Sequence, residues 1–350
     1  MKESNIWIFL DNEGPCTRND NAQESTVALA EQCGLGRQIG IEFYRGMSTV
    51  DDIWGDFRRI AKDPEYSSGH TLKAILPFHR AMGATSQWHY NFAKINLRVV
   101  PHIREVLRNL SNKYNLWQVS TSYEFFIRAF CNRVGFDFRK TRCTLVSGFD
   151  EIPITKEQSQ ILLDFMKEVA RMPIIEYDEG TGEVISKHKV YYERITAFIW
   201  EVVYRLPVGE LLRTIHPVGQ AQKLEAMIEI LQESNIPEEK AFYVGDSQTD
   251  VRCVQHLQDK GLTMMFNGKG KVCDSSHIMY IGEDARAIEE VADQFAELGK
   301  KGVINYYTPA REAEYGGLLA ATTPENITQL REMSVKKRKE FRGIHIGELT

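Results

Sequence analysis

The chain has 350 residues, of which 43% are hydrophobic and 26% charged, and its formal net charge at pH 7 is −5. These values are typical of a globular protein with one large domain carrying insertions, or with two domains. They exclude a global basic surface of the kind that recruits nucleic acid, so an anionic ligand must be attracted locally. No stretch approaches the roughly 20 apolar residues of a membrane helix, so we expect no membrane partner.

Six cysteines are scattered along the chain without a Cys-x-x-Cys pair. Their spacing argues against a zinc site and against a disulfide framework. The segment Met1–Asn5 leads into the first apolar run without the features of a signal peptide. We therefore expect reduced thiols and a cytoplasmic protein.

The first predicted element is a strand at Ile6–Leu10, five apolar residues that are followed by Asp11, Glu13, Gly14 and Pro15. The length of the run and the Gly-Pro breaker favour a buried strand of a parallel sheet. In open α/β sheets, ligands bind beyond the carboxyl ends of the strands. The two carboxylates are therefore expected where a first strand would present chemistry.

Asp11 and Glu13 are only two residues apart, and their negative charges repel unless a cation or ligand uses them. Mg²⁺ is typically bound by one or two carboxylates together with substrate phosphates. An aspartate can also attack phosphorus and form an aspartyl-phosphate. The alternative is an Asp-x-Glu pair that only caps a turn.

The next segment is predicted to be helical throughout. Residues 24–33 are amphipathic and end at Gly34-Leu-Gly36, as helices often do. From residue 41 to residue 93 the pattern stays helical, with no strand-like alternation. We predict a small helical insertion over residues 21–93.

Strands and helices alternate next, which implies a parallel sheet. The second predicted strand ends in Ser120 and Thr121. The predicted elements of this segment are a helix at 101–110, a strand at Leu116–Val119, a helix at Glu124–Val134 and a strand at Thr144–Gly148.

Residues 151–215 interrupt this alternation. Lys156–Arg171 and Tyr191–Thr214 are predicted helices, and the polar segment Glu176–Lys189 separates them. The segment is either a second insertion or an elaborate crossover between strands. As an insertion it would form a second lid or an oligomer surface, for example that of a homodimer.

Lys223 begins an amphipathic helix, and strands alternate with helices again after it. The first of these strands ends in Gly245-Asp-Ser-Gln-Thr-Asp250. A basic run at Lys336–Lys339 is interpreted as a solvated helix end in preference to a nucleic-acid contact. The predicted elements are strands at Ala241–Val244, Thr263–Asn267 and Ile278–Ile281, and helices at Ala285–Leu298 and Pro324–Glu340.

Four features in this order resemble the motifs of the haloacid dehalogenase (HAD) superfamily, which consists mostly of phosphohydrolases on a Rossmann-like core. The motifs are Phe9-Leu-Asp11-Asn-Glu13-Gly14, Trp117-Gln-Val-Ser120, Lys223 and Gly245-Asp246-Ser-Gln-Thr-Asp250, and Phe266-Asn267-Gly268 is similar to a segment that commonly follows. The resemblance covers residues 5–20, 95–150 and 215–298. It does not extend to the two helical blocks or to the C-terminal tail.

The resemblance implies that Asp11 attacks the phosphorus and that Glu13 acts as general acid and later as base. It also implies Mg²⁺ held by Asp11, by Asp246 or Asp250, and by the backbone carbonyl of Glu13. A convergence of these distant carboxylates on one cation is the central expectation.

For the phosphoryl oxygens, the resemblance implies Lys223 together with Ser120 or Thr121, which would act by positioning and electrostatics. Taken singly, Lys223 is more typical of a helix surface, and Ser120 of a helix cap. The sequence leaves the choice between the two hydroxyls open.

Glu13 is a departure from the family pattern, because the phosphatases usually carry Asp at this position. The extra methylene moves the proton donor by roughly an angstrom, and such a shift can change the rate about a hundredfold. The motif Asp-x-Glu-Gly-Pro is similar to that of a mainly archaeal and bacterial subgroup, of which some members are known only through association with hydrogenase complexes.

We therefore predict an α/β protein with a Rossmann-like parallel sheet core, a helical cap insertion and a second, mostly helical insertion. The predicted boundaries are a discontinuous core at 1–20, 94–150 and 216–299, a cap at 21–93, a second insertion at 151–215 and a C-terminal helical extension at 300–350. In the cap, the candidate substrate contacts are Arg45, Arg58, His79, Arg80, Trp88 and His89.

The predicted function is that of a Mg²⁺-dependent phosphatase acting on a small phosphorylated metabolite through an aspartyl-phosphate. One alternative is a phosphotransferase or phosphomutase. The other is a non-catalytic or weakly active HAD-like subunit that binds a phospho-ligand or a partner protein.

Overall fold

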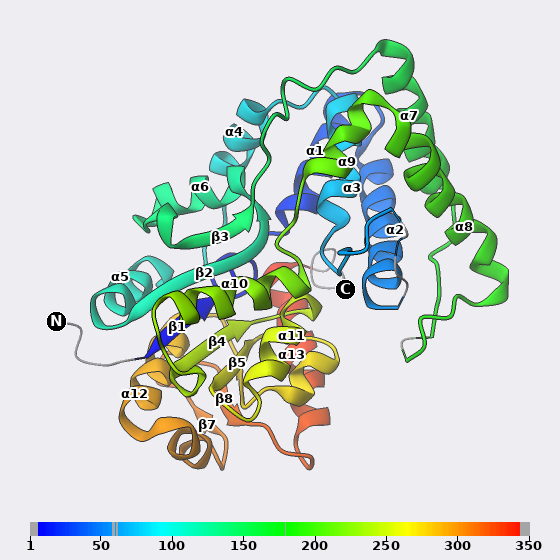
Figure 1. Cartoon of the computed structure of the whole chain (residues 1–350). Helices are drawn as coiled ribbons and strands as arrows, with labels where there is room; N and C mark the ends of the chain where they lie inside the picture. Colours follow the sequence, from blue (N-terminus) through cyan, green and yellow to red (C-terminus); the bar gives the residue numbers. More distant parts are fainter. Residues whose placement is uncertain (1–5, 58–59, 61, 179, 344–350) are drawn as a thin grey trace.

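The computed structural model of the chain describes residues 6–57, 60, 62–178 and 180–343. Its centre is a sheet of eight strands in the order β3-β2-β1-β4-β5-β6-β8-β7 (Figure 1). Strands β1 to β6 are parallel, and β8 is antiparallel to both β6 and β7. The strands are β1 (Trp7–Leu10), β2 (Asn115–Tyr123), β3 (Thr141–Thr144), β4 (Ala241–Gly245), β5 (Leu262–Phe266), β6 (Ile278–Ile281), β7 (Arg311–Glu312) and β8 (Leu318–Ala321).

The six parallel strands have the Rossmann order 3-2-1-4-5-6. The predicted α/β class with a mostly parallel sheet is thereby confirmed. From β1 to β3 the chain adds strands on one side of β1, and from β4 onward it adds them on the other side. Ligands of such sheets bind in the crevice at the carboxyl ends of the two strands where this reversal occurs, here β1 and β4. Asp11 follows β1 and Asp246 follows β4, so both lie at this crevice.

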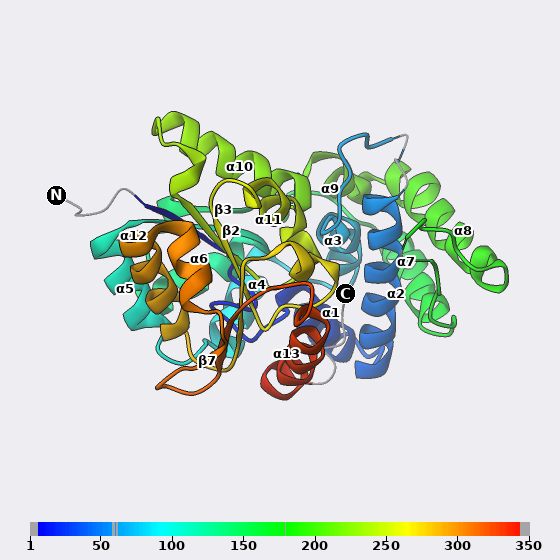
Figure 2. The same cartoon turned by 90° about the horizontal axis from the view of Figure 1, so that it is seen from below.

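The helices cover both faces of the sheet and form a separate layer beside it (Figures 1 and 2). None of the helices in the described part of the chain has the length and apolarity to cross a membrane. They are α1 (Asn21–Gln32), α2 (Arg37–Asp56), α3 (Thr71–Ala81), α4 (Ser86–Asn96), α5 (Ile103–Lys113), α6 (Glu124–Val134), α7 (Lys156–Val169), α8 (Lys189–Ala197), α9 (Glu210–Thr214), α10 (Gln220–Glu233), α11 (Val251–Leu257), α12 (Arg286–Tyr306) and α13 (Ile327–Arg342).

Strand β1 shows why the opening run is apolar throughout. Successive side chains of a strand point to opposite faces of the sheet. Ile8 and Leu10 belong to a core shared with α5, α6 and α12, whereas Trp7 and Phe9 belong to a second core shared with α10 and α11. Because helices cover both faces, both sets of side chains must be apolar.

The two segments predicted as separate helical blocks share one hydrophobic core. This core joins α1, α2 and α3 to α7, α8 and α9 (Figure 1). At its centre, the Phe165 ring of α7 stacks on Phe198 with ring centroids 3.6 Å apart and lies 6.3 Å from the Phe78 ring of α3. Residues far apart in the sequence therefore build a single helical layer.

Two predicted strands have different bounds in the structure. β2 continues to Tyr123, with a register shift between Val119 and Tyr123, so Ser120 and Thr121 lie within the strand and not after it. β3 occupies Thr141–Thr144 and ends where the predicted strand begins. Among the described residues it pairs only with β2, so it is an edge strand of the sheet. Polar residues are tolerated in an edge strand, and the search for apolar runs therefore missed it.

The predicted helix Tyr191–Thr214 is not continuous. α8 ends at Ala197, irregular helical turns follow, and α9 begins only at Glu210. Pro207 explains the break, because proline disfavours helical backbone in the residue before it. Leu206 has ψ of 154°, which is extended backbone.

The C-terminal tail contributes to the sheet as well as a helix. β8 pairs with β6, and β7 pairs with β8, although neither strand was predicted. The predicted closing helix ends where expected, because Gly299 has non-helical backbone, and a second helical segment continues α12 to Tyr306. Helix α13 (Figure 2) then packs against β6 and the turn Lys271–Ser275.

Candidate active site

A cavity of about 110 Å³ lies at the carboxyl ends of β1, β2 and β4. From the sheet side it is lined by Asp11 and Glu13 of the loop after β1, by Ser120 and Thr121 of β2, and by Asp246 after β4. Residues of α1, α2, α3 and α13 complete the lining. The cavity is thus bounded by segments that are far apart in the sequence.

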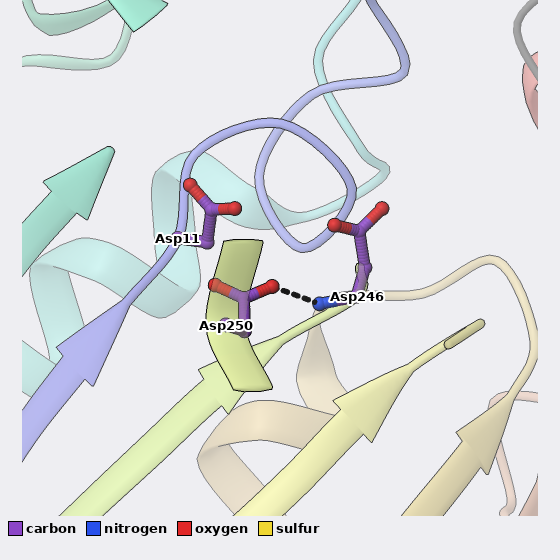
Figure 3. Close-up of side chains that lie close together, drawn as sticks. All are labelled: Asp11, Asp246 and Asp250. Atoms are coloured by element: carbon purple, nitrogen blue, oxygen red, sulfur yellow. Dashed lines mark hydrogen bonds between the residues drawn. The ribbon is translucent and has the colours of Figure 1, made fainter. Parts of the chain in front are cut away.

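Three carboxylates meet at this crevice. Asp11, Asp246 and Asp250 each offer one oxygen within 4.8 Å of the others, and all three residues are buried (Figure 3). The structure therefore brings Asp11 of the first predicted motif together with Asp246 and Asp250 of the last, and the Glu13 side chain is not part of this cluster.

Lys223 lies between two of these carboxylates in the first turn of α10. Its Nζ donates to Asp11 Oδ2 at 2.7 Å, to Asp250 Oδ1 at 2.8 Å and to Thr249 Oγ1 at 3.1 Å. Burial alone would lower the pKa of the ammonium, but the two carboxylates raise it above its ordinary value. Lys223 is therefore a permanent cation against Asp11, and it is not a surface residue.

Asp250 accepts four hydrogen bonds and is held firmly. Its Oδ1 accepts from Lys223 and from the Tyr243 hydroxyl at 2.6 Å, and its Oδ2 accepts from the backbone N–H groups of Asp246 and Ser247. Both oxygens are thus used inside the protein. This arrangement positions Lys223 and the loop after β4, and it favours Asp246 over Asp250 as a metal ligand.

The loop after β1 turns tightly so that Glu13 faces the cavity. Gly14 has φ of +101°, and a Cβ atom there would lie 2.2 Å from Asp246 Oδ2. Only glycine allows both this backbone conformation and this approach. The backbone N–H groups of Cys16 and Thr17 both donate to the Asn12 carbonyl, which closes the turn.

The Glu13 carboxyl group is partly buried and lies beside another acid. Its Oε1 accepts the backbone N–H of Asn21 at 2.9 Å. Burial, reinforced by the nearby Asp20 charge, raises the pKa of Glu13 to about 8. Glu13 is accordingly protonated at neutral pH, which is the form that a proton donor needs.

The two hydroxyl groups of β2 differ in how they are bonded. Ser120 Oγ accepts the backbone N–H of Ser122 at 3.2 Å. Thr121 Oγ1 is buried and has no hydrogen-bond partner among the described residues. Both residues line the cavity, so both can reach a ligand there.

A hard divalent cation fits the oxygen donors of this crevice. Mg²⁺ prefers carboxylate and carbonyl oxygens and binds few protein ligands at a time. Asp11 and Asp246 supply such oxygens, whereas the described part of the chain offers no His or Cys to the same cluster. The donor set suits a hard ion such as Mg²⁺.

Two arginines of α13 are functional candidates that the sequence interpretation missed. Arg338 and Arg342 both line the cavity and both form ion pairs with Asp246 Oδ2. Burial alone would raise the pKa of Asp246, but the two guanidinium groups lower it below its ordinary value. The spacing of four residues places both arginines on one face of the helix. The sequence analysis did not single them out, because the lysines around Arg338 indicated a solvated helix end.

The cap presents a different set of residues from the predicted one. Tyr44, Ser48 and Asp51 lie on one face of α2, and Thr71 begins α3. Their helical spacing was visible in the sequence, but a polar helix face usually indicates contact with solvent.

The predicted cap contacts have structural partners, and none of those that the structure describes lines the cavity. Arg58 lies outside the described residues. Arg45 pairs with Glu42, His79 bonds to Thr26, Arg80 bonds to the Ala84 carbonyl, Trp88 bonds to Gln32, and His89 stacks on Phe125.

No protein-family model matches the sequence, and no curated protein matches it. The structure is similar to that of gene product AF1437 from Archaeoglobus fulgidus, with a TM-score of 0.78, 21% identity and coverage of 99% of both chains. At this identity the likeness concerns the fold, and it extends over the whole chain.

Two structures of phosphoserine phosphatase are also similar, at lower scores. The apo form has a TM-score of 0.45 and 13% identity, over 82% of this chain and 98% of that chain. A phospho-aspartyl intermediate analogue has a TM-score of 0.46 and 14% identity, over 82% of this chain and 99% of that chain.

Proposed function

We propose that the chain is a Mg²⁺-dependent phosphatase of the HAD type that hydrolyses a small phosphorylated metabolite through an aspartyl-phosphate on Asp11. This proposal rests on one observation: Asp11, Asp246 and Lys223 lie close together at the carboxyl ends of β1 and β4. In-line phosphoryl transfer requires a nucleophile, a bound cation and a fixed positive charge. Asp11 would be the nucleophile, Asp246 would hold the cation, and Lys223 supplies the positive charge.

In the first step, a carboxylate oxygen of Asp11 attacks phosphorus, and the bond from phosphorus to the ester oxygen breaks. Glu13 gives its proton to the leaving alkoxide, which departs as an alcohol. Support comes from the pKa of Glu13, which burial raises to about 8, so that the proton is present at neutral pH.

In the second step, the Glu13 carboxylate takes a proton from a water molecule, whose oxygen attacks the phosphorus of the aspartyl-phosphate. The bond from phosphorus to Asp11 breaks, and inorganic phosphate leaves. The two residues return to their starting protonation states, because Glu13 regains the proton that it gave to the alcohol.

The phosphoryl oxygens would be held by Lys223 and by the β2 hydroxyls. Thr121 Oγ1 is a buried group without a partner in the described chain, and Ser120 lies beside it on the cavity wall. Mg²⁺ held by Asp11, Asp246 and the Glu13 carbonyl would neutralise phosphate charge and fix the geometry. Asp250 would hold Lys223 in position and would not bind the ion directly.

A small phosphorylated substrate is compatible with the cavity volume of about 110 Å³. Tyr44, Ser48 and Asp51 of the cap face the same space and would contact the leaving group. Closure of the cap over the site would keep other water molecules away from the aspartyl-phosphate.

The experiment is a screen of small phosphorylated metabolites for phosphate release, with Mg²⁺ present or chelated. We expect release that stops on chelation and that falls by at least about a thousandfold in Asp11→Asn and Asp246→Asn. Asp274→Asn is a matched control, because Asp274 is an exposed carboxylate paired with Arg331. Release that survives in Asp11→Asn would contradict the proposal.

One observation favours a second candidate, a subunit that binds a phospho-ligand without turning it over. Arg338 and Arg342 already form ion pairs with the carboxylate proposed as a metal ligand. This candidate predicts phosphate binding with no release across the panel, and binding that is unchanged in Asp11→Asn. An added alcohol acceptor in the same assay would reveal phosphotransfer instead of hydrolysis.

A further inference from the structure

Helix α13 brings two positive charges to one buried oxygen. Arg342 Nη1 lies 2.8 Å from Asp246 Oδ2, and Arg338 Nη1 is in contact with the same atom. The side chains of both arginines are 5% exposed, and that of Asp246 is 2% exposed. Salt screens buried charges much less than exposed ones, so both guanidinium groups would interact strongly with any ion bound at Asp246.

The arginines are fixed by further contacts as well as by Asp246. Arg342 donates to the backbone carbonyls of Arg18 and Asn19 in the loop that leads to α1. Arg338 lies near the carbonyl of Asn267 at 3.5 Å. α13 thus ties the loop after β1 to the segment after β5 and holds its charges at the metal ligand.

The helix itself is anchored to the core. Ser334 Oγ donates to the Gly268 carbonyl at 2.7 Å, and Leu330 and Phe341 are buried. The arginine side chains therefore cannot leave Asp246 together without a shift of α13 or a change of rotamer in a closed space. Departure of the guanidinium groups has an energetic cost.

The three carboxylates of the cluster already have cationic partners in the protein. Lys223 pairs with Asp11 and Asp250, and Arg338 and Arg342 pair with Asp246. A divalent ion at the carboxylates would meet two fixed cations a few ångströms away. Like charges at such distances in a buried site repel strongly.

We propose that α13 sets the divalent-cation affinity of this site, with Arg338 and Arg342 as positioning residues that compete with the cation for Asp246. The free protein then binds Mg²⁺ weakly, and a phosphorylated ligand, which brings negative charge of its own, restores binding. This inference rests on the proposed function in one respect, because it assigns Asp246 to the metal.

The test is binding of Mn²⁺ alone, as a paramagnetic substitute for Mg²⁺, measured by electron paramagnetic resonance and by calorimetry without substrate. Each substitution removes a buried positive charge a few ångströms from the cation and with it the repulsion between like charges, so we expect Arg338→Met and Arg342→Met each to tighten binding at least about tenfold. Arg338→Lys keeps the charge and is expected to stay within about threefold of the unmodified chain. Arg331 of the same helix is half-buried and pairs with Asp274, away from Asp246, so Arg331→Met is expected to have no effect.

Equal or weaker Mn²⁺ binding in both methionine variants would overturn the inference. Equal tightening in Arg338→Met and Arg338→Lys would also overturn it, because charge would then not be the cause. Each arginine is tested singly, so a folding defect in one variant, checked by circular dichroism, leaves the other decisive.

The same measurement separates this inference from the proposed function. Mn²⁺ binding that is lost in Asp246→Asn and tightened in the methionine variants supports the inference even if no metabolite is hydrolysed. Mn²⁺ binding that is unchanged in Asp246→Asn would refute it even if hydrolysis is found.

Discussion

At the scale of single residues, the protonation of Glu13 determines how activity should depend on pH. Burial raises the pKa of this carboxyl to about 8, so the proton is present below that pH and lost above it. As a general acid, Glu13 must be protonated when the substrate binds, and kcat/KM should therefore fall as the pH rises through about 8.

The measurement is a pH profile of phosphate release, in which Glu13→Gln is expected to be slower by about 10²–10⁴-fold and to lack the alkaline decline. The glutamine keeps the size and the acceptor for the Asn21 N–H but has no acidic proton. A rate that stays level well above pH 8 in the unmodified chain would argue against Glu13 as the acid.

Gly14 gives a second prediction at this scale. In Gly14→Ala the new Cβ would lie 2.2 Å from Asp246 Oδ2, in a backbone conformation with φ of +101°. We expect a loss of about 1–3 kcal/mol of unfolding free energy from backbone strain, together with loss of phosphate release because Asp246 must move.

Gly34→Ala is the matched control for this variant. Gly34 also has a positive φ of +85°, but a Cβ atom there would meet no atom of the described residues within 4 Å. It should therefore lose stability by backbone strain while keeping its activity. If Gly14→Ala retains full activity, the close approach of the two loops does not matter for function.

How far the sequence could predict the site also differs from residue to residue. Asp11, Glu13, Lys223, Asp246 and Asp250 were found because each stands at the end of an apolar strand or the start of a helix, and parallel strands share one edge. The arginines of α13 could not be found in this way. Their role depends on where helix α13 packs in the fold, and the residues next to them in the sequence do not determine that position.

At the scale of elements, helix α7 offers a test of stability that is independent of activity. Thr155 caps its N-terminus, with its side chain accepting the N–H of Gln158 while Gln158 bonds back to the Thr155 backbone. Thr155→Ala should lower the unfolding free energy by about 0.5–2 kcal/mol, measured by urea denaturation. Thr155 does not line the cavity, so phosphate release should stay unchanged.

The accuracy of the predicted elements follows from the strength of their local signals. α6 was predicted with its observed bounds because an amphipathic segment ends there at Gly135, which adopts a positive φ of +77°. β3 and β8 were misplaced or missed, because an edge strand and a strand that closes the sheet depend on partners contributed from elsewhere in the chain. Tertiary pairing overrides weak propensity in such strands.

At the scale of the whole molecule, the shared core of the two helical segments predicts that they unfold together. Phe165 is buried between Phe198 and α3, and Phe165→Ala should cost about 3–5 kcal/mol of unfolding free energy. Trp54 in α2 and Trp200 after α8 lie with ring centroids 5.6 Å apart, so their fluorescence reports both segments.

Ile161→Ala on the same helix is the control, because Ile161 is 45% exposed and should contribute far less to stability. In Phe165→Ala, fluorescence and circular dichroism should report one transition at a lower denaturant concentration. Two separate transitions would show that the helical segments are independent units.

The central claim is that Asp11 carries the phosphoryl group while a cation is held at Asp246. It is tested most directly by incubating the chain with a reactive phosphoryl donor such as acetyl phosphate and Mg²⁺, reducing the acyl phosphate with borohydride, and locating the product by mass spectrometry. We expect modification at Asp11 that disappears on chelation of Mg²⁺ and in Asp246→Asn. Modification at another residue, or at Asp11 without any divalent cation, would contradict the account.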